Sequence, residues 1–455
     1  MTRGVAVFGL GKVGMTLAAC LAKSGHRVVG VDVNADIVDS LNKRAVQTTE
    51  RGVLERIADI PRDQLAATTD PSVAVKETDA SFVIVPTPSN TLGGFSNQFA
   101  HKACAEIGDA LRNTKHAHTV AMVSTVLPGT SDARFIPALE KKSGRKIGDG
   151  LGYCYNPSFI ALGEVVKGFE EPDYLLVGES DAKSGDVIID IHNKMIRNNA
   201  PLARMTPVEA EIAKIASNTH ETMRVSFANM LLSICAEVPG ANVDRITGAL
   251  VHRMGRRFFR GAVPYGGPCW PRDNQALSVF MDMIGAPSQL PRTVDTSNAE
   301  HGRYVLRKIL NVAPPRSKVG IIGLAYKPGT PVIERSYSID LATWLRAEGR
   351  TVLAWDPQAM ADSRKALGSD VTFCADAESC LSQSDTVVVA LPLPQLASID
   401  WSAAKNATVV DCWRALPQAA QQAVGRYVPL GIGKDEDKVR WIDRVGGERF
   451  DLLTN

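Results

Sequence analysis

Short apolar runs alternate with helix-like patterns in the first part of the chain. Residues 4–8 (GVAVF) form an apolar run suited to a buried parallel strand, and HRVVGVDVN (26–34) forms another. SFVIVPTP (81–88) and HTVAMVSTVLPGT (118–130) each pass from apolar residues into a polar loop. This alternation predicts a doubly wound α/β domain whose ligand-binding groups gather at the carboxyl ends of its strands.

The pattern becomes helical at Thr206. From there to about Val238, apolar residues recur at three- and four-residue spacing, and no glycine or proline follows Pro207. Thr206 can cap a helix, Pro207 suits its first turn, and Glu209 adds an acidic start. We predict a helix over 207–238, roughly 50 Å long at about 1.5 Å per residue. A helix of that length bridges domains or packs against a partner subunit.

A second α/β pattern follows residues 313–317. Its predicted strands are KVGIIGLAY (318–326), RTVLAWDP (350–357), SDTVVVALP (384–392) and ATVVDCWR (407–414). No periodic pattern is visible from about Gly425. The fold class predicted is therefore α/β, with two Rossmann-like doubly wound domains joined by a helical domain. The predicted domains are 1–200, 201–312 and 313–455.

Charge and cysteine content restrict the partners and the compartment. Lys and Arg number 51 against 49 Asp and Glu, with no long basic run, so we expect neither a nucleic-acid nor a membrane partner. No apolar stretch is long enough to span a membrane, and the N-terminus lacks the layout of a signal peptide. The eight cysteines are scattered without CxxC spacing, which argues against disulfides and a metal site. We expect a cytoplasmic protein.

A glycine motif follows the first predicted strand. In GLGKVG, Gly9 permits a tight turn, Gly11 lets the backbone approach a pyrophosphate, and Gly14 allows close packing of helix on strand. The helix N-terminus that follows offers unpaired N–H groups to phosphates. Asp32, at the end of the second predicted strand, can accept hydrogen bonds from ribose hydroxyls and repel a 2′-phosphate. The motif therefore predicts an NAD site.

A lone thiol lies in the turn GAVPYGGPCWPRDN (261–274). The small and rigid residues around Cys269 let a ligand approach its sulfur, and Asp273 can direct a proton. In the long helix, Lys214 and Asn218 share a face. Spacing alone favours a lysine that reaches solvent, whereas the alternative is a buried lysine beside an oxyanion-stabilising amide.

Seven blocks in order carry a resemblance over nearly the whole chain. They are GLGKVG (9–14), VPTPS (85–89), STVLPGT (124–130), YNPSF (155–159), AKIASN (213–218), GGPCWPRD (266–273) and GLAYKPGT (323–330). The chain resembles the UDP-glucose/GDP-mannose dehydrogenase family. That family oxidises the C6 alcohol of a nucleotide-linked hexose to a carboxylate, with two NAD and a covalent cysteine intermediate. UDP-glucose or a UDP-N-acetylhexosamine is the substrate type that the overall resemblance favours.

The resemblance implies a role for each matching residue. Cys269 takes the position of the nucleophile, Lys214 that of a proton acceptor or oxyanion stabiliser, and Asn218 that of the oxyanion-binding amide. Asp273 matches the aspartate that helps to activate water or the lysine, and Thr125 the hydroxyl that orients the water. Expected NAD contacts are Gly9, Gly11, Lys12, Val13, Gly14, Asp32, Pro86, Thr87, Pro88, Ser124, Thr125 and Arg335. Expected substrate contacts are Asn156, Phe159, Lys214, Asn218, Arg253, Phe258, Arg260, Tyr265, Gly266 and Lys327.

Arg253 is the residue that the family takes from a neighbouring subunit, so the resemblance implies a homodimer or a higher homo-oligomer. The chain also departs from the family pattern. Ser158 replaces the glutamate that helps to hydrolyse the thioester, and a hydroxyl is no base near neutral pH. Leu162 stands where many members have a second glutamate, and Glu334-Arg335 reverses the usual order. In DCWR (411–414) the family's arginine aligns nearer Trp413, which leaves Arg414 as a candidate only.

Four readings of Ser158 stay open. Thr125 and Asp273 suffice for hydrolysis, the last step is slow, the product is an aldehyde, or the serine is an engineered trap for the covalent intermediate. Two alternatives for the whole chain are a nucleotide-sugar binding protein without turnover and a β-hydroxyacid dehydrogenase. The set of Lys214, Asn218, Cys269 and Asp273 argues against the first, and the second α/β pattern argues against the other.

Overall fold

The computed structural model describes residues 3–434, which form two compact units. The first unit runs to Ser217 and also contains Gln275–Ala286. The second unit comprises Asn218–Asn274 and the chain from Pro287 onward. Two helices, α9 (Pro207–Glu237) and α11 (Trp270–Met283), cross these divisions. The three domains predicted with divisions at residues 200 and 312 stay a prediction.

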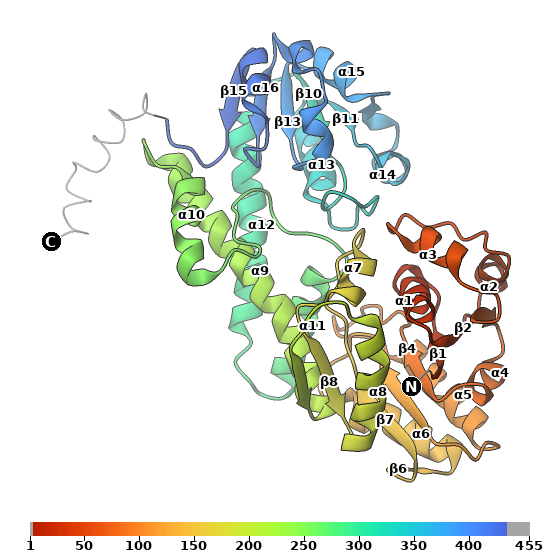
Figure 1. Ribbon diagram of the computed structural model, residues 1–455. Helices are drawn as coiled ribbons and strands as arrows, with labels where there is room; N and C mark the ends of the chain where they lie inside the picture. Colours follow the sequence, from red (N-terminus) through yellow and green to blue (C-terminus); the bar gives the residue numbers. More distant parts are fainter. Residues whose placement is uncertain (1–2, 435–455) are drawn as a thin grey trace. The chain divides into compact units, whose positions relative to one another are not determined.

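The first unit contains a mainly parallel sheet. Its strands follow the order β3-β2-β1-β4-β5-β7-β8-β9, with β6 paired to β7 and with β7 and β8 antiparallel (Figure 1). They are β1 (Gly4–Phe8), β2 (Arg27–Val31), β3 (Leu65–Thr68), β4 (Ala80–Val83), β5 (His118–Met122), β6 (Lys146–Ile147), β7 (Gly150–Tyr155), β8 (Leu175–Glu179) and β9 (Leu202–Met205). The helices are α1 (Lys12–Lys23), α2 (Ala35–Asn42), α3 (Val53–Asp59), α4 (Pro71–Lys76), α5 (Gln98–Leu111), α6 (Ile136–Ser143), α7 (Val165–Glu170) and α8 (Ala182–Met195), with a π-helical turn η1 (Ser131–Phe135) before α6.

The predicted strands of this sheet form, but they are shorter than the apolar runs. β4 ends at Val83 and β5 at Met122, so VPTPS and STVLPGT lie entirely in the loops beyond them. Prolines explain part of the shortening, because Pro86 and Pro128 have no N–H to donate to a neighbouring strand. The two loops therefore begin at the carboxyl ends of adjacent parallel strands.

Helix α9 matches the prediction and ends one residue earlier, at Glu237. Its start is closed by Thr206 and Glu209. The backbone N–H and the hydroxyl of Thr206 both donate to Oε2 of Glu209, at 2.8 and 2.7 Å. The N–H of Glu209 in turn donates to the hydroxyl of Thr206 at 3.5 Å, and this reciprocal bonding satisfies N–H groups that have no partner inside the helix.

The second unit contains a parallel sheet with the order β12-β11-β10-β13-β14-β15 (Figure 1). Its strands are β10 (Lys318–Ile322), β11 (Thr351–Trp355), β12 (Thr372–Phe373), β13 (Thr386–Val389), β14 (Thr408–Asp411) and β15 (Arg426–Pro429). The helices are α10 (Val243–Met254), α12 (Gln289–Leu310), α13 (Tyr337–Ala347), α14 (Met360–Leu367), α15 (Ala377–Ser382) and α16 (Gln418–Ala423). Three short 3₁₀ turns are η2 (Gly368–Asp370), η3 (Pro394–Ala397) and η4 (Trp401–Ala404).

Strand β15 was not visible in the sequence pattern, because its residues are half-buried or exposed and do not alternate. The rest of the predicted final segment, residues 435–455, lies outside the described residues. The second half of α9 contributes Leu232 and Cys235, and α10 contributes Val243, to the core formed with α12 and the second sheet. The predicted fold class, two Rossmann-like α/β domains with a central helical region, is confirmed.

Candidate functional site

The turn after β1 requires glycine at two positions. Gly9 has a φ of +93°, and a Cβ atom there would lie 2.5 Å from the carbonyl oxygen of Ile84. A Cβ atom on Gly14 would lie 1.8 Å from the carbonyl oxygen of Gly9. A side chain at Gly14 would therefore push helix α1 away from the turn after β1, and one at Gly9 would collide with the segment that follows β4.

Gly11 has a different environment. Within the described part of the chain, a Cβ atom added to Gly11 would have no neighbour within 4 Å. Gly11 precedes α1, and the first helical hydrogen bond runs from the N–H of Met15 to its carbonyl, at 2.9 Å. The amides of Lys12, Val13 and Gly14 consequently have no acceptor inside the helix. Open space and unused N–H groups at a helix N-terminus fit the phosphates of a dinucleotide.

Asp32 lies beside this turn. One carboxylate oxygen accepts the N–H of Leu10 at 2.7 Å, and the other accepts the N–H of Asn34 at 2.9 Å. The side chain is half-buried, so the carboxylate keeps acceptor positions for a ribose. The residues present therefore fit NAD at this end of the sheet.

The loops after β4 and β5 are hydrogen-bonded to each other. The hydroxyl of Thr87 donates to the carbonyl of Thr125 at 2.8 Å. Ser124 accepts the N–H of Val85 at 2.9 Å and donates to its carbonyl at 2.7 Å. The structure thus brings the predicted cofactor residues of the two loops together at one edge of the sheet.

Lys214 is a buried lysine, with 8% of its surface exposed. Its Nζ donates to the carbonyl of Ser158 at 2.7 Å and lies 4.5 Å from the ring centre of Phe159. The reading that spacing alone favoured, a lysine reaching solvent, is wrong, because the YNPSF segment covers this face of α9. The backbone carbonyl of residue 158 holds Nζ, so this contact does not depend on which side chain stands there.

Glu211 is a residue that the sequence analysis missed. Its side chain is fully buried, and its carboxylate accepts the N–H of Gly129 at 2.6 Å and the N–H and hydroxyl of Ser131 at 2.9 and 2.6 Å. Burial raises the pKa of this carboxyl group. Glu211 lies three residues before Lys214 and ties α9 to the loop that follows Thr125. An acidic residue inside an apolar helix pattern was the available signal.

In the second unit, Cys269 differs from the other cysteines. All eight cysteines lie in described residues, and seven are buried while Cys269 is exposed. Burial raises the pKa of Cys20 to about 12 and also raises the pKa of Cys104, Cys154, Cys235 and Cys412. The carbonyl of Cys269 accepts the first hydrogen bond of α11, from the N–H of Asp273 at 2.8 Å. Cys269 is therefore the residue that directly precedes helix α11.

Asp273 is fully buried and held from two sides. The amide of Asn218 donates to one carboxylate oxygen at 2.6 Å, and Nε of Arg272 donates to the other at 2.9 Å. These contacts bring Asn218 and Asp273 together one helical turn after Cys269. They fix the carboxylate by one amide and one charge-assisted hydrogen bond.

The turn before Cys269 packs against the loop between β10 and α13. A Cβ atom on Gly266 would lie 2.0 Å from the carbonyl oxygen of Arg335, and one on Gly267 would lie 2.6 Å from the ring of Tyr326. The N–H of Gly267 donates to the carbonyl of Glu334 at 3.1 Å. Both glycines are required by this close approach, and the same loop contains the half-buried Lys327.

The predicted substrate residues fall into separate environments. Phe258 is 39% exposed, with its ring edge against Trp270, and Arg253 is exposed on α10. Tyr265 is buried and donates its hydroxyl to Asp295. Asn156 lies in the first unit.

The amide of Asn156 is engaged inside the fold. Its Nδ2 donates to the carbonyl of Leu176 at 2.8 Å, and its Oδ1 lies 2.7 Å from Nε2 of His192. Only 4% of its surface is exposed. A substrate role for Asn156 stays a prediction, because the visible contacts of its amide are structural.

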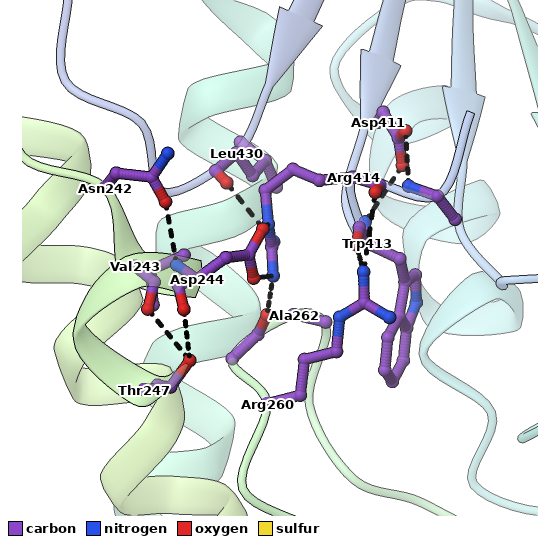
Figure 2. A network of polar contacts seen from close by, with 12 residues as sticks. Asn242, Val243, Asp244, Thr247, Arg260, Ala262, Asp411, Trp413, Arg414 and Leu430 are labelled. Carbon is purple, nitrogen blue, oxygen red and sulfur yellow. Dashed lines mark hydrogen bonds and ion pairs between the residues drawn. The ribbon is translucent and has the colours of Figure 1, made fainter. Parts of the chain in front are cut away.

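Arg414, a candidate ligand residue, is buried instead in the network of Figure 2. Its guanidinium pairs with Asp244, while Arg260 donates to the backbone of Trp413. Across residues 3–434, no group of three or more His, Cys, Asp or Glu is placed to hold a metal ion. Within that same range, no helix is long and apolar enough to cross a membrane.

Three domain models of one family match the chain. The NAD-binding domain of the UDP-glucose/GDP-mannose dehydrogenase family matches residues 3–196, its central domain 208–300 and its UDP-binding domain 320–418. UDP-glucose 6-dehydrogenase of Haloferax volcanii is 32% identical, over 90% of this chain and 96% of its own length. The chain belongs to the UDP-glucose/GDP-mannose dehydrogenase family.

Other members of the UDP-glucose/GDP-mannose dehydrogenase family extend the comparison. GDP-mannose 6-dehydrogenase of Pseudomonas aeruginosa is 32% identical over 77% of this chain and 80% of its own length. A UDP-glucose dehydrogenase structure from Pyrobaculum islandicum superposes with a TM-score of 0.85 at 29% identity, covering 95% of this chain and 98% of that one. The family comprises NAD-dependent nucleotide-sugar 6-dehydrogenases, so the expected enzyme class, resemblance and cofactor are confirmed. A β-hydroxyacid dehydrogenase does not account for the match over 320–418.

Proposed function

We propose that this enzyme oxidises the C6 hydroxyl of a nucleotide-linked hexose, of the UDP-glucose or UDP-N-acetylhexosamine type, to the carboxylate through a thioester on Cys269. The observation that carries the proposal is the position of Cys269. It is the exposed cysteine among the eight, it precedes helix α11, and its turn is fixed by Gly266 and Gly267. A fixed, accessible thiol at the positive end of a helix is suited to nucleophilic catalysis.

The chemistry needs a covalent step because an aldehyde is a poor hydride donor. NAD, when bound, supplies the hydride acceptor for each of the two oxidations. The Cys269 thiolate adds to the aldehyde carbon, forming a C–S bond, and the carbonyl oxygen takes up a proton to give a thiohemiacetal. Loss of a hydride and of the hydroxyl proton gives the thioester. Water then adds, the C–S bond breaks, and the carboxylate and the thiol are released.

The chain's own residues divide this work. Lys214 carries a buried amino group that can take the alcohol proton or stabilise an oxyanion, and Asn218 adds an amide N–H. Asp273 is held in a single orientation by Asn218 and Arg272, as a carboxylate that directs a water must be. Thr125 is half-buried in the loop after β5 and would orient that water.

Ser158 decides how the thioester is released. Because Lys214 binds the backbone carbonyl of residue 158, the lysine keeps this contact without a glutamate. The first candidate is therefore hydrolysis by Thr125 and Asp273, with the acid as product. The second candidate, an aldehyde product or a stalled thioester, is favoured by the absence of a carboxylate at Ser158 itself.

Cofactor and product stoichiometry test the proposal. With a panel of nucleotide sugars, two NADH per sugar and a carboxylate product are expected. One NADH per sugar supports the aldehyde product, whereas a single burst of two NADH per active site without further turnover supports the stalled thioester. Cys269→Ser should lower turnover by about a thousandfold or more, while the buried Cys374→Ser serves as the matched control. Full turnover by Cys269→Ser would contradict the covalent route. Ser158→Glu should speed acid formation if hydrolysis limits the rate, and intact-mass measurement would detect an acylated Cys269.

We further propose that the enzyme is a homodimer. In the second unit, α9 exposes Met223, Phe227, Met230 and Ile234, whose exposed fractions are 37%, 37%, 45% and 50%. Their spacing of four, three and four residues forms one apolar stripe. A second copy of the chain is the proposed occupant, since the family resemblance supplies Arg253 from a neighbouring subunit. Met230→Glu with Ile234→Glu should give monomers in light scattering, and an unchanged dimer would contradict this assignment.

A further inference from the structure

Arg414 follows strand β14 and is almost completely buried, with 4% of its side chain exposed. Its Nε and Nη2 donate to the two carboxylate oxygens of Asp244, each at 2.9 Å. Nη1 donates to the carbonyls of Cys412 at 2.9 Å and Leu430 at 3.2 Å, and Nη2 also donates to the carbonyl of Gly261 at 2.7 Å. Each of the five N–H groups of the guanidinium is used in this way. Figure 2 shows Arg414 beside Asp244 and Leu430.

These contacts join three separate segments of the second unit. Asp244 lies in the first turn of α10, Leu430 follows β15, and Gly261 belongs to the loop 255–265. Asn242 caps α10 through the N–H of Asp244 at 2.9 Å, which holds the carboxylate's own backbone in place. The arginine therefore fixes elements that are not neighbours in the sequence.

Two adjacent residues of the loop 255–265, Arg260 and Gly261, contact the segment that follows β14. A Cβ atom on Gly261 would lie 2.4 Å from the carbonyl oxygen of Ala228, so the loop also lies closely against α9. Nη2 of Arg260 donates to the carbonyl of Trp413, and Arg260 is otherwise exposed (Figure 2).

The segment that receives these contacts is itself fixed. Fully buried Asp411 accepts the N–H groups of Trp413, Ala415 and Leu416 at 3.0, 2.7 and 2.9 Å. The segment after β14 is thus held by Asp411, and the Arg414 guanidinium has all its N–H groups engaged within the protein. Arg414 cannot hold a ligand without breaking the fold, but it can hold the loop that does.

We propose that Arg414 is a positioning residue that fixes the loop 255–265 on the C-terminal α/β domain and thereby sets the affinity for the nucleotide sugar. The inference rests on the proposed function for its substrate, because Phe258 and Arg260 of that loop are expected substrate contacts. Arginine is needed here, since a lysine ammonium cannot form the fork to Asp244 and also reach three carbonyls.

The experiment compares Arg414→Lys and Asp244→Asn with the wild-type enzyme. Both variants should raise the KM for the nucleotide sugar about tenfold or more and change kcat less than about threefold, because the loop acts on binding. Hydrogen exchange of residues 255–265 in the enzyme without substrate should accelerate about tenfold. Arg346→Lys is the matched control, since Arg346 forms an exposed ion pair with Asp370 in the same domain.

The two readouts separate the two proposals. If the wild-type enzyme turns over no nucleotide sugar, the proposed function fails, and hydrogen exchange alone decides the role of Arg414. Unchanged exchange in 255–265, or a fall in kcat at constant KM, overturns the positioning role. If Arg414→Lys does not fold, Asp244→Asn gives the answer, because Asp244 is 39% exposed and the amide keeps one acceptor oxygen.

Discussion

Each of the two α/β domains begins with a strand that runs into a glycine turn, but the helix that follows the turn starts differently in the two domains. After β1, helix α1 begins at Lys12, and the glycine before it has no side chain that could cap the helix. After β10, a long segment precedes α13, whose first turn is capped by the hydroxyl of Ser336, which accepts the N–H of Ser338 at 3.3 Å. The first helix N-terminus is left open for an anion, whereas the second is closed by its own chain.

The aspartates at the ends of the second strands show the same contrast. Asp32 is half-buried and accepts two backbone N–H groups. Asp356 is 3% exposed and accepts four, from Leu324, Ala325, Gln358 and Ala359, at 2.7 to 3.2 Å. One residue type at one topological position therefore suits a ligand in the first domain and holds the fold in the second.

The largest effect that tests this comparison is expected for Asp356→Ala. Four backbone N–H groups, three of them on buried residues, would lose their acceptor, which should lower the free energy of unfolding of the second unit by about 4 kcal/mol. Urea unfolding followed by tryptophan fluorescence measures the change. A loss below about 1 kcal/mol would show that Asp356 does not hold the turn.

Gly14→Ala and Gly11→Ala form a matched pair in the first domain. The Cβ atom on Gly14 would meet the carbonyl of Gly9, so we expect a loss of about 3 kcal/mol in stability. Gly11→Ala should leave stability within about 1 kcal/mol, since the added methyl group meets open space. It should nevertheless weaken NAD binding about tenfold or more, because phosphates approach through that space. Equal losses of stability in both variants would contradict the packing role of Gly14 and the open position of Gly11.

Lowering the pH should reduce the stability of the N-terminal α/β domain more than that of the C-terminal α/β domain, because the chain after residue 312 contains no histidine. Burial lowers the pKa of His192 to about 4 and that of His118 to about 3. A histidine kept neutral in the fold contributes stability above its unfolded pKa near 6.5, and that stability is lost as the pH falls toward the folded pKa. His192 alone accounts for about 3 kcal/mol of loss between pH 6.5 and 4.

The variant His192→Gln, which can still donate to Asn156, should flatten the acid dependence of unfolding for the first unit. Thermal unfolding at pH 7 and pH 5 measures it. If the variant and the wild type lose the same stability between pH 7 and pH 5, another group is responsible for the loss.

The comparison also shows what the sequence could predict. The roles of Gly9 and Gly14 follow from the motif, because strand, turn and helix are adjacent in the chain. The burial of Lys214 does not, since the segment that covers it lies more than fifty residues away at Ser158. Arg414 is the same case, because its partners Asp244 and Gly261 come from a distant part of the chain.

The smallest effect is expected for Asp32→Asn. This variant distinguishes most clearly between the ligand-binding role of the aspartate in the first domain and its structural role in the second. Because the substituted amide keeps an acceptor oxygen for the turn and Asp32 is only half-buried, stability should fall by less than about 1.5 kcal/mol. The Kd for NAD should rise about tenfold, which is about 1.4 kcal/mol, since the ribose loses a charged acceptor. Removal of the negative charge should also improve binding of NADP relative to NAD.

Calorimetric titration of both cofactors measures these affinities. Asp356→Asn is the counterpart, and it should lose stability and keep its affinity for NAD. A loss of NAD affinity in Asp356→Asn would mean that the closed turn of the second domain also affects the cofactor site.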